Sequence, residues 1–134
     1  MSDIVYQAII PIHPITKKNN QKIITNRRTN RPMIIQNEKY TTYENQAGWF
    51  LRKPKQPIDY PVNIECRFYR KNAVRCDLTN LLEAIDDVLV KYGIIKDDAF
   101  TILQSHDGSR VYIDKDKPRT EIIIKKIRQE GEDK

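Results

Sequence analysis

Six acidic residues lie close together between positions 77 and 98 of a chain that is otherwise basic. They are Asp77, Glu83, Asp86, Asp87, Asp97 and Asp98. Clustered carboxylates repel one another and repel polyanions unless a divalent cation lies between them, and hard cations prefer oxygen ligands of this kind. A basic surface around the cluster would attract nucleic acid. The combination suits hydrolysis of a phosphodiester by a metal that activates water and offsets charge on the phosphate.

The segment at about 79–92 is predicted to be a helix that carries half of this cluster. Its apolar residues fall on one side at 100° per residue. The acidic and polar residues on the opposite side are Thr79, Asn80, Glu83, Asp86 and Asp87. A solvated helix face explains the same pattern without a metal, with Asn80 as the N-terminal cap and Glu83 as its reciprocal partner.

The Asp97-Asp98 pair favours the metal site over the solvated face. A short apolar stretch follows Gly93, a residue suited to the C-terminal end of a helix. The chain can turn back along the helix there and bring Asp98 beside Asp77. Acids that are distant in sequence would then form one oxygen-lined site for a hard cation.

Basic residues gather ahead of the acidic segment, in a chain whose net charge is +6. Those expected to contact DNA are Lys17, Lys18, Arg27, Arg28, Arg70, Lys71 and Arg75. Arginine binds phosphate through bidentate hydrogen bonds. Arg75 is the first choice because it lies closest to Asp77. For each single cation, a solvated side chain with no ligand remains the alternative.

Other chemistry finds little support in the sequence. Cys66 and Cys76 have no His or Cys partner at zinc-ligand spacing, so we expect reduced thiols in a cytoplasmic protein. His13 and His106 are isolated and are assigned no catalytic role. The sequence has no Gly-rich phosphate loop and no apolar run near the ~20 residues that cross a bilayer, so neither a nucleotide cofactor nor a membrane partner is expected.

Periodicity predicts an α+β fold, in which a single small domain at 1–128 has a mixed β-sheet and two main helices. Residues 129–134 are expected to be a frayed C-terminal tail. A hydrophobic content of 39% suggests that a dimer interface completes the burial. Strands are predicted at 4–12, 61–70, 99–105, 109–113 and 119–127, a basic-tipped hairpin from 22–25 and 33–36, and helices at 37–53 and 79–92.

The acidic segment resembles the RusA family of phage- and prophage-encoded Holliday junction resolvases. The matching residues are Asp77-Leu78-Thr79-Asn80-Leu81-Leu82-Glu83-Ala84, Asp87, Gly93 and Lys96-Asp97-Asp98, with a Pro-rich opening at 11–20. The resemblance implies a homodimer that binds four-way DNA junctions in recombination and repair. It also implies two symmetric nicks made with Mg²⁺, for which Mn²⁺ can substitute. Asp77 and Asp98 match catalytic acids of the family.

Two residues depart from the family pattern. Thr79 stands where the pattern has its second catalytic Asp, and Glu83 stands where it has a Lys. Glu83 is one helical turn from Thr79, so it could supply the missing carboxylate. The predicted catalytic residues are therefore Asp77, Glu83 and Asp98, and Asp87 joins them as a metal ligand. Two alternatives remain open: a catalytically inactive DNA-binding dimer, or a small basic RNA-binding protein with structural acids.

Overall fold

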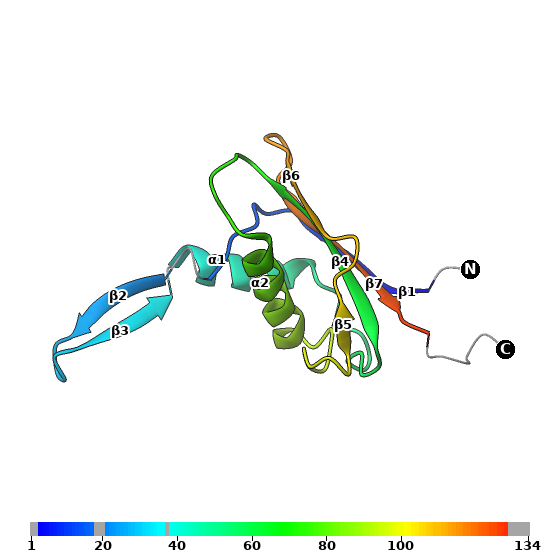
Figure 1. Ribbon diagram of the computed structural model, residues 1–134, viewed down its shortest axis with the longest axis horizontal. Coiled ribbons are helices and arrows are strands. Elements are labelled where there is room, and N and C mark those ends of the chain that lie inside the picture. The colour runs from blue at the N-terminus through cyan, green and yellow to red at the C-terminus, as the bar shows by residue number, and fades with distance from the viewer. Residues whose placement is uncertain (1–2, 18–20, 37, 129–134) are drawn as a thin grey trace.

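The computed structural model of the protein describes residues 3–17, 21–36 and 38–128 (Figure 1). The predicted tail at 129–134 and the predicted DNA contact Lys18 lie outside the described residues. The elements in chain order are β1 (Ile4–Ile10), β2 (Gln21–Asn26), β3 (Arg31–Gln36), α1 (Glu38–Ala47), the 3-10 helix η2 (Gly48–Phe50), β4 (Val62–Arg70), α2 (Leu78–Lys91), β5 (Leu103–Ser105), β6 (Arg110–Ile113) and β7 (Arg119–Lys126).

The five-stranded sheet is mixed, as the sequence predicts. Its order is β1-β7-β4-β5, and β6 also pairs with β4. β7 runs antiparallel to both β1 and β4, whereas β5 and β6 run parallel to β4. Along β4 every second residue is buried, from Val62 to Arg70. This alternation confirms the predicted period of two, because successive side chains of a strand point to opposite faces.

The two helices share one core with the inner face of the sheet. α2 buries Leu81, Ile85 and Val88 against inward-facing residues of β1, β4 and β7, and Ala47 of α1 joins the same cluster. Burial of each large aliphatic side chain contributes about 1.5–3 kcal/mol. The α+β arrangement with two main helices is therefore confirmed. No helix among the described residues is long and apolar enough to span a membrane.

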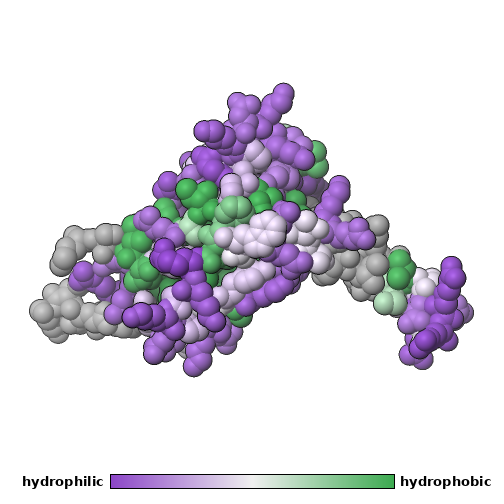
Figure 2. Space-filling view, turned by 180° about the vertical axis from the view of Figure 1, so that it is seen from behind, coloured by the Kyte–Doolittle hydropathy of each residue, from purple (hydrophilic) through white to green (hydrophobic). Residues whose placement is uncertain are grey.

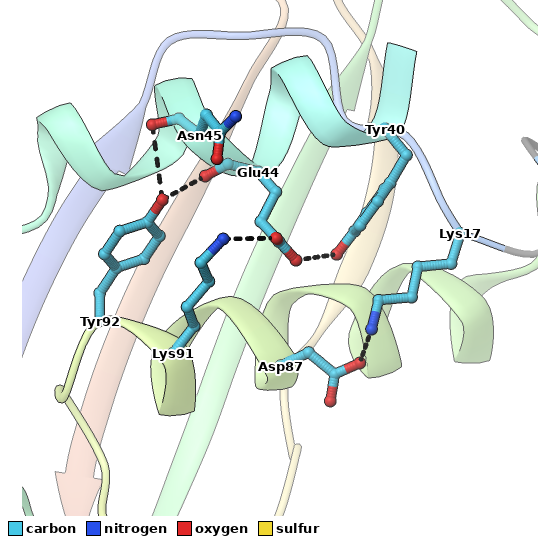
Figure 3. A network of polar contacts seen from close by, with 7 residues as sticks. All are labelled: Lys17, Tyr40, Glu44, Asn45, Asp87, Lys91 and Tyr92. Carbon is cyan, nitrogen blue, oxygen red and sulfur yellow. Dashed lines mark hydrogen bonds and ion pairs between the residues drawn. The ribbon is translucent and has the colours of Figure 1, made fainter. Parts of the chain in front are cut away.

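Polar contacts fix α1 against α2 (Figure 3). The carboxylate of Glu44 accepts hydrogen bonds from Nζ of Lys91 at 2.6 Å and from the hydroxyl of Tyr40 at 3.3 Å. The hydroxyl of Tyr92 donates to the backbone oxygen of Glu44 at 2.8 Å. These contacts hold the C-terminal half of the acidic helix in place relative to α1.

Most element bounds lie within two residues of the predictions, and three differences have a clear structural description. The first helix was expected to reach residue 53, but α1 ends at Ala47 and continues only as η2. β1 ends at Ile10, just before Pro11, which cannot donate to a sheet. β5 starts at Leu103, because residues 99–102 form a turn in which the amide of Ile102 bonds to the carbonyl of Ala99 at 2.9 Å.

The hairpin of β2 and β3 forms as predicted and extends away from the body of the domain (Figure 1). Its two strands pair only with each other among the described elements. Arg27, Arg28 and Arg31 at its end are exposed. Figure 2 shows this end as a hydrophilic cluster set apart from the body.

Candidate active site

Asp77 is the N-cap residue of α2, directly before the first helical turn. Its carboxylate makes no capping hydrogen bond to the described backbone and is about half exposed. Nε of Arg75 lies 3.8 Å from Oδ1, and Nδ2 of Asn80 lies 3.5 Å from Oδ2. The positive end of the helix favours a negative charge here. The prediction that Asn80 caps the helix is wrong. The backbone N–H of Asn80 donates to the Asp77 carbonyl at 3.1 Å, so Asn80 already lies inside the helix.

α2 separates the carboxylates that the sequence placed on one face. Asp87 turns toward the segment after β1, where Nζ of Lys17 lies 2.6 Å from Oδ2 (Figure 3). Asp86, 100° further round the helix, turns to the opposite flank and contacts His106. Glu83 is exposed to solvent between them. The three acids therefore do not share one face: Asp87 and Asp86 lie on opposite flanks of the helix, and Glu83 lies on the solvent side between them.

The Asp86–His106 contact is the part of the site that sequence reasoning missed. Nε2 of His106 lies 2.9 Å from Oδ2 of Asp86, and Nδ1 lies 2.8 Å from the Ile64 carbonyl on β4. Burial alone would lower the pKa of His106, but the hydrogen bond and charge of Asp86 outweigh it and raise that pKa. Burial raises the pKa of Asp86, partly offset by His106, and the charges of Asp98 and Asp87 raise it further.

Asp98 lies on the Asp86 flank of the helix. The chain after α2 is held by Ile95, which bridges to Ile58, and by the Lys96 amide, which donates to the Ile58 carbonyl at 2.9 Å. Asp98 follows as an exposed residue whose amide donates to Asp97 at 2.7 Å. Its negative charge adds to the effect of burial in raising the pKa of Asp86. The predicted return of Asp98 to the side of Asp77 stays a prediction.

The predicted metal ligands do not meet at one point within the part of the chain that the structure describes. Asp77 stands at the helix N-terminus, Glu83 faces solvent, Asp87 pairs with Lys17, and Asp98 lies toward Asp86. Across residues 3–17, 21–36 and 38–128, no three His, Cys, Asp or Glu side chains are close enough together to hold a metal ion. The ligand set therefore stays a prediction.

The donor chemistry of this region nevertheless suits a hard cation. All the acids offer carboxylate oxygens, which Mg²⁺ and Mn²⁺ accept as ligands. Oδ1 of Asp86 is buried and has no hydrogen-bond partner among the described residues. A buried acceptor left unpaired costs about 1–3 kcal/mol, which a nearby cation would offset.

The basic residues expected to contact DNA fall into three groups. Arg75 and Lys71 are exposed in the segment between β4 and α2. Arg27 and Arg28 lie at the end of the β2–β3 hairpin, away from the acids (Figure 1). The third group comprises two less accessible residues, Lys17 in its ion pair with Asp87 and Arg70, which is only 8% exposed.

Comparison with known proteins finds a family model and a relative that match this chain. Residues 11–125 match the family model described as "Endodeoxyribonuclease RusA". The crossover junction endodeoxyribonuclease RusA of Aquifex aeolicus (strain VF5) is 28% identical over 94 residues, which cover 69% of this chain and 71% of that protein. The family-model match includes the whole acidic segment from Asp77 to Asp98.

Proposed function

We propose that this chain, which belongs to the RusA family of endodeoxyribonucleases, resolves four-way DNA junctions by paired symmetric nicks. The observation that supports this most strongly is the family match, because it spans residues 11–125 and so takes in both Asp77 and Asp98. The relative from Aquifex aeolicus carries a crossover-junction name. An acidic helix beside exposed cations fits a nuclease that must approach a polyanion.

Asp77, Glu83, Asp87 and Asp98 are proposed to hold Mg²⁺, or Mn²⁺ in its place. When bound, a divalent cation would lower the pKa of a water ligand and offset charge on the scissile phosphate. Mg²⁺ sites commonly use one or two carboxylates together with oxygens of the substrate phosphate. Because the four acids do not meet at one point among the described residues, one or two of them would bind an ion, and oxygens of the bound DNA would complete its ligand set.

The remaining residues of the site would bind and orient the DNA. Arg75, 3.8 Å from the Asp77 carboxylate, is placed to receive a phosphate beside that acid, and Lys71 is exposed in the same segment. Arg27 and Arg28 would contact a more distant part of the substrate from the hairpin end. A homodimer with two active sites about one two-fold axis would account for two symmetric cuts.

A junction-binding dimer that no longer cuts is the second candidate, and Thr79 is the residue that favours it. Thr79 lies in the first turn of α2 and is exposed, at the position where the family pattern has an acid. Without that acid the site has one carboxylate fewer near Asp77. Glu83, one turn further on, is proposed to replace it.

The experiment that tests the proposal is nicking of a synthetic mobile four-way junction by the purified protein. A matched linear duplex serves as the substrate control, and reactions are run with and without Mg²⁺. Paired nicks in the junction alone, lost without metal, would support a resolvase. Tight junction binding without nicks in Mg²⁺ or Mn²⁺ would favour the inactive binder. Neither binding nor cutting would overturn both candidates.

A further inference from the structure

A cavity of about 650 Å³ opens between α1, the segment after β1 and the segment that joins β4 to α2. This volume lies within the range of roughly 300–1,000 Å³ that is usual for small-ligand sites. The charged residues that line it are Glu38, Lys39, Arg70, Lys71 and Arg75. Cys76 also lines the cavity, and Asp77 is the next residue in the chain, so the cavity lies beside a predicted catalytic acid. Four basic groups against one acid make it a place for an anionic group.

Arg70 forms part of the cavity wall although it is a buried cation. Its guanidinium contacts the carbonyls of Pro14 and Val74 and Nε2 of His13. No carboxylate pairs with it among the described residues. A guanidinium has five N–H donors, so three contacts leave at least two donors for a further acceptor. A buried charge without a counter-ion is costly, and an acceptor in the cavity would offset that cost.

His13 adds a second incomplete set of hydrogen bonds at the same wall. Its Nδ1 lies 3.1 Å from the amide of Lys71, and its Nε2 lies 3.2 Å from Nη2 of Arg70. Both neighbours are donors, but a neutral imidazole has a single acceptor nitrogen. Burial, Arg70 and Lys71 lower the pKa of His13 to about 4, so the ring is neutral near pH 7. One donor at this wall therefore lacks an acceptor within the described residues.

Part of the remaining lining is apolar and part is polar, from residues such as Thr42, Gln46 and Asn72, and the apolar part distinguishes the cavity from a plain phosphate site. Ile12, Ile15 and Val74 line it together with the cations. A nucleotide has both parts, a flat base that apolar and guanidinium surfaces accept and a phosphate that cations accept. Base edges such as those of guanine accept two N–H bonds from one arginine. The donors left on Arg70 and the apolar part of the wall both match such a ligand.

We propose that this cavity holds one nucleotide of the DNA, unstacked next to the branch point, with its base toward Arg70 and its phosphate toward Lys71 and Arg75. The proposal rests on the junction-resolving function proposed above and adds to it a site for base selection beside Asp77. Extruding a base costs a few kcal/mol in a paired duplex and least where pairing is already disturbed, as at a branch point.

The test uses four-way junctions that carry 2-aminopurine at single positions around the branch point, with the whole chain and without metal. The fluorescence of this base increases when it leaves the stack. Thr42→Phe would fill the cavity from α1, where Thr42 is an exposed lining residue. Thr41→Phe is the matched control, because Thr41 is exposed on the same helix and does not line the cavity. Gln46→Phe, another lining position, replaces Thr42→Phe if that variant does not fold.

The expected result is a fluorescence increase at one position with the wild type and Thr41→Phe, lost with Thr42→Phe. In Mg²⁺, preference among bases at the cut site should fall about tenfold in Thr42→Phe, as loss of one base contact predicts. Junction binding with no increase at any position, or with an equal increase in both variants, would overturn the cavity proposal alone. A wild-type chain that does not bind the junction would overturn the proposed function as well.

Discussion

Nε2 of His106 lies 2.9 Å from Oδ2 of Asp86, and this contact joins α2 to the end of β5, which runs parallel to β4. The other ring nitrogen lies 2.8 Å from the Ile64 carbonyl, which can only accept a hydrogen bond. Both nitrogens therefore face acceptors, and the protonated ring satisfies both. The side chains are 20% and 14% exposed, so the pair is largely shielded from water.

A double-mutant cycle on Asp86 and His106 should reveal strong coupling. Asp86→Ala, His106→Ala and the double variant are compared by urea unfolding at pH 6. We expect each single change to lower the free energy of unfolding by roughly 1.5–3 kcal/mol, because each leaves a buried polar partner behind. The double change should cost less than the sum of the single changes. Additive effects would show that the two side chains do not interact.

His13 should make the protein less stable in mild acid. Its pKa is lowered to about 4 in the folded chain, from an ordinary value of 6.5, by burial and by Arg70 and Lys71. The unfolded chain therefore binds a proton at His13 more readily than the folded chain does. The contribution of neutral His13 to the free energy of unfolding is full above pH 6.5 and is lost as the pH falls toward 4. When the pH is lowered from 7 to 4, the free energy of unfolding should therefore fall less steeply for His13→Asn than for the wild type.

His106 gives the matched control for that series, since its pKa is raised in the folded chain. Its contribution is present below 6.5 and is lost as the pH rises through the folded pKa. His106→Asn should therefore change the pH profile in the opposite sense. Parallel profiles for the wild type and His13→Asn would contradict the lowered pKa of His13.

Asp77→Asn should separate junction cleavage from junction binding. The substitution keeps the shape of the N-cap residue and removes one proposed oxygen ligand with its charge. Cleavage is expected to fall at least about 100-fold, which corresponds to about 2.7 kcal/mol of transition-state stabilisation. Binding measured in EDTA should stay the same or tighten, because a charge that repels phosphate is lost. Asp59→Asn, at an exposed position on the segment before β4, is the control and should cut normally.

Local periodicity was enough to predict most of the framework. The alternation along β4 and the apolar stripe of α2 depend on neighbouring residues alone, and both elements begin and end within one residue of the prediction. The inward position of Arg70 followed from the same alternation, but the charge of the residue favoured an exposed loop. Burial is possible there in part because the carbonyls of Pro14 and Val74 accept hydrogen bonds from the guanidinium.

The contact of Asp86 with His106 had no comparable signal. It joins residues twenty positions apart and depends on how β5 lies along β4, where Val62 pairs with Leu103 and Asn63 with Ser105. The helical repeat placed Asp86 correctly on the polar side of α2 but did not specify which flank the sheet would approach. A lone His after a short strand gave no reason to expect a carboxylate partner.

The exchange at positions 79 and 83 predicts a rescue. If Glu83 supplies the carboxylate that Thr79 lacks, Glu83→Gln should lower cleavage at least about 100-fold, or about 2.7 kcal/mol, with junction binding intact. Adding Thr79→Asp to the Glu83→Gln chain should raise cleavage again by at least about tenfold, which corresponds to about 1.4 kcal/mol. Both positions are exposed on α2, so neither change should unfold the domain. Normal cutting by Glu83→Gln would remove Glu83 from the site.

The arginines at the hairpin end should govern the salt dependence of junction binding. Arg27 and Arg28 are exposed at the tip between β2 and β3, where Asn26 holds the turn through a bond from the Arg28 amide to its Oδ1 at 2.9 Å. Each phosphate contact releases counter-ions, so replacing both with Gln should lower the slope of log affinity against log salt by about 1.8 if both bind duplex phosphates. Lys55→Gln, an exposed change between η2 and β4, tests for a general effect of charge. Equal slopes for the wild type and the Arg27→Gln/Arg28→Gln chain would place the hairpin outside the DNA contact.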